Sequence, residues 1–249
     1  MSNLEKAEKK NRIFIRFFEE FNSSNLALLL LLFCVIHWLF NFVNSEFIAT
    51  DEIFDQYLEE RQIEKYGEDY NELADEFEED IVDLDDDDDY YWSDQAWDFG
   101  IILLLKAIQF TLTTAFFFVA LTLKPETDKL SFAQIFKIVV ISEFVFFIPT
   151  LIKLIWFGFM DQEYDYSEIR SFYPFSLLGA IGVINVNEWM IYPLKVVNLF
   201  EIIYVYLIIV GIHQVSNLKF SLIAKPITVS YLLLLFMWIS IRVYLSTVF

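Results

Sequence analysis

Long apolar runs separated by polar segments dominate the chain. The clearest runs cover about residues 25–43, 100–123, 134–158 and 227–247. A helix rises about 1.5 Å per residue and the apolar core of a bilayer is about 30 Å thick, so roughly 20 apolar residues are enough to cross it. The pattern therefore predicts four transmembrane helices over these ranges.

A fifth apolar run covers about residues 194–214 and follows Pro193, a residue that suits the first turn of a helix. We interpret it as another crossing. The shorter run 176–184 cannot span a bilayer and is typical of a re-entrant or interfacial segment. Together the runs predict an all-α fold, a polytopic membrane helical bundle of about five transmembrane helices.

Helical spacing also occurs outside these runs. Residues 13–21 place four phenylalanines on one helical face, which indicates either a short helix at the inner membrane surface or an extension of the first crossing. Between the first two crossings, Phe54 and Leu58 are four residues apart. The same steps of three and four connect Tyr66, Tyr70, Leu73 and Phe77. These spacings predict one or two amphipathic acidic helices.

Negative charge is concentrated in one segment of the chain. The formal net charge is −19 although 57% of the residues are hydrophobic. Residues 45–98 contain 23 of the 36 acidic residues and only two basic ones, which leaves 13 acidic and 15 basic residues elsewhere. No basic stretch of the kind that binds nucleic acid is present, so we expect no nucleic-acid partner. The one cysteine, Cys34, cannot form an intrachain disulfide.

The distribution of lysine and arginine predicts the orientation in the membrane. Nine of them lie in 1–24, 124–133 and 215–226, whereas the longer segments 45–99 and 159–193 contain three. Because cytoplasmic loops carry the excess of positive charge, we expect a cytoplasmic N-terminus and an extracytoplasmic C-terminus. The expected location is the membrane itself, as a multi-pass integral protein of the cell or inner membrane if the source is prokaryotic.

These features divide the chain into four parts. We expect a cytoplasmic, basic and amphipathic N-terminus, a first transmembrane helix, an acidic extracytoplasmic helical insertion and a four-helix membrane domain. In chain order, their ranges are 1–24, 25–43, 44–99 and 100–249.

The acidic insertion contains five consecutive aspartates: Asp85, Asp86, Asp87, Asp88 and Asp89. Calcium prefers carboxylate oxygens, but an EF-hand loop needs a glycine at its sixth position and none falls there. A run of like charges is usually a solvated loop, which is the interpretation we favour. One alternative is a surface that docks a basic partner or weakly binds a divalent cation. The other is a defined metal site.

Ionisable residues also occur within the apolar runs, where they are costly and often functional. By residue count, Lys106, Lys153, Glu201 and Arg242 fall near one level in the outer half of the membrane, and Glu143 lies nearer the centre. We expect a polar cluster in which Glu201 pairs with one or more of the three cations. A structural pair with snorkelling lysines is one interpretation, and a transport path or a pocket for an anionic ligand is the other.

Patterns that carry catalysis are missing from the chain. It contains no GxSxG, P-loop, HExxH or GxGxxG sequence. We therefore expect a protein that is not an enzyme and that needs no cofactor. The expected partners are the lipid bilayer and, as a hypothesis, another membrane or extracytoplasmic protein.

The stretch "VVNLFEIIYVYLIIVGIHQVSNLKFSLIAKPITVSYLLLLFMWI", residues 196–239, joins an apolar helix through a short polar loop to a last apolar helix. It resembles the closing part of the Yip (Ypt-interacting protein) family of five-span membrane proteins, and the similarity extends over about residues 100–247. The acidic insertion departs from the family pattern. The resemblance implies a scaffold or interaction role, in membrane traffic and small-GTPase contact for eukaryotic members, and no catalytic residues. A transporter or permease subunit for a small anionic solute is the alternative function.

Overall fold

The structure is a computed structural model, and the regular elements of its described residues are all helices. It describes residues 25–48, 53–58, 63, 88–123, 130–160, 164–182, 186–216 and 218–248. Within these ranges the one extended pairing is an isolated antiparallel bridge between Ser176 and Asn198. The prediction of an all-α fold is confirmed.

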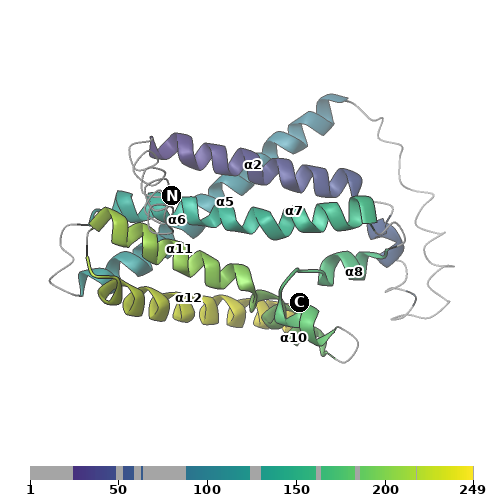
Figure 1. Ribbon diagram of the computed structural model, residues 1–249. Coiled ribbons are helices and arrows are strands. Elements are labelled where there is room, and N and C mark those ends of the chain that lie inside the picture. Colours follow the sequence, from purple (N-terminus) through teal and green to yellow (C-terminus); the bar gives the residue numbers. More distant parts are fainter. Residues whose placement is uncertain are drawn as a thin grey trace, which may run out of the picture.

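In the described part of the chain, five helical crossings form the bundle, and each is long and apolar enough to span a membrane. Their bounds are α2 (Leu26–Phe47), α5 (Asp88–Thr122), the consecutive α6 (Phe132–Glu143), η2 (Phe144–Phe146), α7 (Phe147–Ile155) and η3 (Trp156–Met160), then α11 (Leu199–Ser216) and α12 (Phe220–Val248). They lie side by side with α5 crossing obliquely (Figure 1). The chain is a multi-pass integral membrane protein.

The second crossing begins earlier than its apolar run. Helix α5 starts at Asp88, whereas the run starts at residue 100. Acidic residues at a helix N-terminus are stabilised by the helix dipole, so the helix extends back into the aspartate run. Asp88 and Asp89 thus form the start of α5, and the other three aspartates lie outside the described residues.

Some predicted helices of the polar segments can be located and others cannot. Residues 53–58, which include Phe54 and Leu58, are helical. Ile53 packs against the buried side chains of Ile48, Phe157 and Ile169. The spacings at 13–21 and 66–77 lie outside the described residues.

The third crossing changes its winding near its middle. Ser131 caps its start, because its hydroxyl accepts from the Gln134 N–H at 3.3 Å while the Gln134 amide oxygen accepts from the Ser131 N–H at 3.0 Å. The α6 helix ends at Glu143, and η2 continues as a 3-10 turn. Pro149 follows within α7 and has no N–H to donate to the Val145 carbonyl, which weakens the α-helical ladder at this turn.

The last apolar run before α12 is divided between two helices. The prediction that Pro193 opens the crossing is wrong, because Pro193 lies inside α10 (Glu188–Val196) and α11 begins at Leu199. Asn198 accounts for the break. Its amide nitrogen donates to the Val196 carbonyl at 2.8 Å, and its amide oxygen accepts from the Glu201 N–H at 3.0 Å. One buried side chain therefore ends α10 and caps α11.

Three short helices gather at one end of the bundle, where the third crossing ends and α11 begins (Figure 1). They are α8 (Tyr166–Ser171), α9 (Leu177–Ile181) and α10. We call residues 164–182 and 186–198 the cap. The predicted re-entrant run 176–184 contributes α9, a helix of five residues that Ser176 caps through the Gly179 N–H at 3.1 Å.

An aromatic core holds the first three crossings together. The Phe33 ring of α2 is 5.2 Å from the Phe110 ring, 5.2 Å from Phe144 and 5.1 Å from Phe147. The first two of these contacts are edge-to-face, a favourable geometry for aromatic rings. Packing of these rings therefore sets the spacing between α2, α5 and the broken third crossing.

The aromatic core yields a stability prediction. Phe33→Ala leaves a cavity in the bundle, and we expect a loss of at least about 2 kcal/mol in the free energy of unfolding in detergent. Lipid and detergent are as apolar as the core, so the loss comes from the cavity and the missing contacts. Leu31→Ala, at an exposed position of the same helix, is the matched control and should change little. Equal effects of the two substitutions would contradict the packing described.

Candidate functional site

An ion pair lies between α5 and α6. The Lys106 Nζ is 3.4 Å from the Glu143 Oε1. Gln109 connects the two, because its amide nitrogen donates to the same carboxylate oxygen at 3.1 Å and its amide oxygen accepts from Lys106 at 3.1 Å. Glu143 is only 5% exposed. A carboxylate buried to this extent is stable only when a partner compensates its charge.

Aromatic rings surround the ammonium of Lys106. Its Nζ lies 5.7 Å from the centre of the Phe33 ring and 5.9 Å from that of Phe110. Ring faces attract cations, and this attraction grows when the cation is removed from water. Lys106 therefore joins α2, α5 and α6 through one ion pair and two ring contacts.

The second intramembrane carboxylate, Glu201, lies on α11 near the capped end. Its Oε2 accepts a hydrogen bond from the hydroxyl of Tyr231 on α12. The Tyr231 ring is 5.5 Å from the Tyr204 ring, and the Tyr204 hydroxyl interacts with Glu143. A connected set of polar groups thus runs across four crossings. We call Lys106, Gln109, Glu143, Tyr204, Tyr231 and Glu201 the membrane cluster.

The structure brings together some of the predicted site residues and separates others. Lys106, Glu143 and Glu201 belong to the membrane cluster. Lys153 instead lies near the cap, where the positive charge of Lys195 repels its own. Arg242 places its guanidinium 5.2 Å from the Tyr192 ring of α10.

The expected pairing of Glu201 with a cation is wrong for the described residues. No lysine or arginine among them forms an ion pair with Glu201, which accepts from Tyr231 instead. Depth along a crossing follows from counting residues, but the direction in which a side chain faces depends on how the helices pack. Two residues at the same depth in the membrane therefore need not be in contact.

Sequence reasoning also missed the neutral members of the membrane cluster. Gln109, Tyr204 and Tyr231 carry no charge and were not singled out. A signal was present in the first two, because Gln109 follows Lys106 by three residues and Tyr204 follows Glu201 by three. Residues three apart lie on the same face of a helix. Gln109 therefore lies on the helix face of Lys106, and Tyr204 on that of Glu201.

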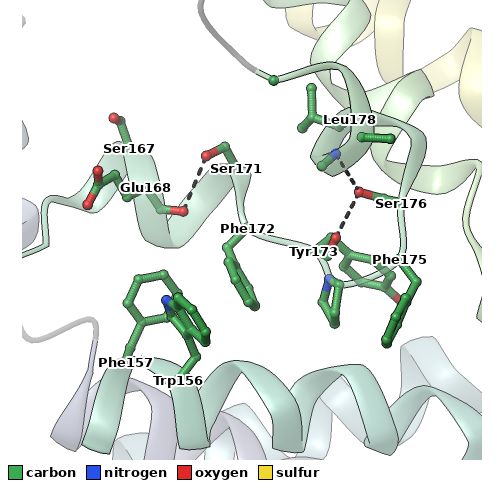
Figure 2. A pocket seen from close by; sticks show the side chains of 14 residues that line it. Trp156, Phe157, Ser167, Glu168, Ser171, Phe172, Tyr173, Phe175, Ser176 and Leu178 are labelled. Carbon is green, nitrogen blue, oxygen red and sulfur yellow. Dashed lines mark hydrogen bonds between the residues drawn. The ribbon is translucent and has the colours of Figure 1, made fainter. Parts of the chain in front are cut away.

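The cap contains a groove of about 750 Å³. Trp156 and Phe157 of η3 line it together with Phe172, Phe175 and Leu178 of the cap (Figure 2). The Phe172 ring packs against the rings of Trp156 and Phe157, with centres 6.0 Å and 5.1 Å apart. Hydroxyls of the cap serines also line the groove. The groove is therefore mainly aromatic, with a polar edge at the end of the crossings.

Phe175 in this groove has an unfavourable backbone conformation. Its φ is 56°, a region that bulky residues avoid, and its side chain is 67% exposed. Such strain costs on the order of 1–3 kcal/mol and persists only where surrounding contacts enforce it. Here the Phe175 carbonyl accepts from the Leu199 N–H at 3.1 Å, and the Leu177 N–H donates to the Val197 carbonyl at 2.8 Å.

Lys195 fastens α10 to α8. Its ammonium donates to the Arg170 carbonyl at 2.8 Å and lies 5.8 Å from the Tyr173 ring. Burial lowers the pKa of Lys195 below its ordinary 10.5, and the charge of Arg170 lowers it further. The pKa of Tyr173 is raised, first by burial and then by the negative charges of Glu201 and Glu143.

A metal centre does not emerge from the described part of the chain, in which no three histidine, cysteine, aspartate or glutamate side chains come together. Comparisons with known proteins add no assignment: no family model, no curated protein and no solved structure matches the chain. The chemistry of the membrane cluster and of the groove in the cap is therefore the basis for a functional proposal.

The ion pair in the membrane cluster can be tested with a double-mutant cycle. Lys106→Met leaves Glu143 buried without its cation, and we expect a loss of about 3–5 kcal/mol in the free energy of unfolding. Adding Glu143→Gln removes the orphaned charge and should restore much of that loss, with a coupling of about 0.5–3 kcal/mol. Thermal unfolding in detergent provides the measurement. Additive effects of the two substitutions would show that the pair is not coupled.

The lowered pKa of Lys195 predicts that the stability of the protein depends on pH. Between the lowered pKa of Lys195 in the folded protein and 10.5 in the unfolded chain, the unfolded chain binds more protons. Stability should therefore rise with pH across that window. Lys195→Met should make this rise smaller, whereas Lys219→Met, at an exposed lysine of another loop, should keep it. Melting temperatures measured against pH compare the slopes, and a slope unchanged in Lys195→Met would contradict the prediction.

Proposed function

We propose that the protein is a non-enzymatic membrane scaffold that binds another membrane protein through the groove of the cap. The observation that carries this proposal is Phe175, which combines a strained backbone with a largely exposed aromatic ring. Two backbone hydrogen bonds hold the strain in place. Strain maintained at an exposed aromatic residue is typical of a binding site.

The chemistry of the groove favours a partner that lies at the membrane boundary. Its walls are aromatic and aliphatic, and Ser167 and Ser171 lie at its edge. The groove also begins at η3, the last turn of the third crossing. A partner with an apolar segment and flanking polar groups at the same depth matches both features, as in many interfaces with aromatic anchors.

The orientation expected from lysine and arginine places the cap outside the cytoplasm. The partner would then be another membrane protein with an extracytoplasmic contact, whereas the resemblance to the Yip family implies contacts on the cytoplasmic side. The proposal keeps the scaffold role that the resemblance implies and assigns it to the opposite end of the bundle.

A transporter is the second candidate, and the membrane cluster is the observation that favours it. Ionisable residues inside a membrane bundle often mark a path for ions or protons. The cluster has one ammonium, from Lys106, and two carboxylates. This excess of carboxylates favours a cationic solute over the anionic one expected from Lys106, Lys153 and Arg242.

The groove can be tested by photo-crosslinking in native membranes. A photoreactive phenylalanine analogue at position 175 should give one protein adduct, because its ring faces the proposed partner. The same analogue at Phe159 is the matched control, since that ring is 81% exposed on η3 and does not line the groove. Ser167→Trp, which fills the groove from its edge, should abolish the adduct. Equal adducts at 175 and 159, or an adduct with lipid alone, would contradict the proposal.

A further inference from the structure

The membrane cluster carries more negative than positive charge. Its ionisable carboxylates are Glu143 and Glu201, and its one cation is Lys106. With both carboxylates ionised, two negative charges face one positive charge, which leaves one uncompensated negative charge inside the bundle. A charge that is partly removed from water is unfavourable unless it is neutralised.

The uncompensated charge can be assigned to Glu201. Lys106 and Gln109 both contact Glu143. Among the described residues, the Glu201 side chain receives one hydrogen bond, from the neutral hydroxyl of Tyr231, and the negative charge of Glu143 acts on it through space. A hydroxyl can donate to a carboxylate but cannot cancel its charge.

Among the described residues, the groups near Glu201 offer further oxygen atoms, and no cation pairs with it. The charged and titratable groups near it are Tyr204 of its own helix, Tyr231 of α12, Glu143 of α6 with Lys106 of α5 behind it, and Tyr173 of the cap. Lys195, the nearest lysine along the chain, donates to the Arg170 carbonyl. Oxygen atoms of carboxylate and phenol groups are suited to holding a proton or a hard monovalent cation.

We propose that Glu201 is a binding site for one monovalent cation, either a proton or Na⁺, taken up from the capped end of the bundle. When the cation is a proton, it comes from water and forms an O–H bond on the Glu201 carboxylate, and no other bond changes. Glu201 is only half-buried and stands two residues from the start of α11, beside the cap. The site is thus adjacent to the surface and connected to Glu143 through Tyr231 and Tyr204. It does not depend on the groove around Phe175.

Infrared spectroscopy of the full-length protein in detergent tests this site directly, because a protonated carboxyl has a carbonyl band that a carboxylate lacks. We expect a carbonyl band that titrates with pH and that disappears in Glu201→Gln. The matched control is Glu168→Gln, at an exposed carboxylate of the cap, which should retain the band. A band that persists in Glu201→Gln, or that is lost in Glu143→Gln instead, would overturn the assignment.

Salt distinguishes the two cations. Replacing N-methylglucamine chloride by NaCl at constant ionic strength should shift the midpoint of the band by about one pH unit per tenfold Na⁺ if Na⁺ competes for the site, and leave it unchanged if the site takes only protons. Tyr231→Phe provides a second variant if Glu201→Gln does not fold, because it removes the hydroxyl that contacts Glu201. We expect it to move the midpoint of the band. An unchanged midpoint in Tyr231→Phe, like the absence of any titrating band in the unmodified protein, would overturn the proposal.

Discussion

The pairing of Lys106 with Glu143 is the constraint on which the rest of the bundle depends. A carboxylate that is almost fully buried among apolar helices is tolerated only when its partners reach it. Lys106 and Gln109 reach it from α5, and the hydroxyl of Tyr204 reaches it from α11. These contacts fix the rotation of three helices at once, whereas apolar packing alone permits several rotations of similar energy.

At the capped end, single polar side chains hold the backbone in place where the helices stop. Asn198 ends α10 and begins α11, Ser176 begins α9, and Lys195 links α10 to α8. Each satisfies backbone groups that a helix terminus leaves open, which matters most near a membrane where water is scarce. The ordered geometry of the cap follows from these bonds and from the two backbone hydrogen bonds that hold the strain at Phe175.

The sequence was informative about the crossings and much less so about their contacts. Length and apolarity alone identify a spanning helix, so all five runs could be found. The break before α11 was missed because Pro193 suits the start of a helix in general. Here the hydrogen bonds of Asn198 determine where α10 ends and α11 begins. The partner of Glu201 was missed because the rotation of each helix depends on contacts between helices, such as that of Phe33 with Phe110. The sequence of one helix does not determine these contacts.

The third crossing is one continuous helical span in which the winding changes at η2 from α-helix to 3-10 and back. Glu143 is the last residue of α6, and α7 continues into η3, which borders the cap. The helix is least restrained at η2, where Pro149 has removed one backbone hydrogen bond, so a tilt of α7 would bend the span there. Because Glu143 is the residue directly before η2, such a bend would change the geometry of the buried ion pair with Lys106.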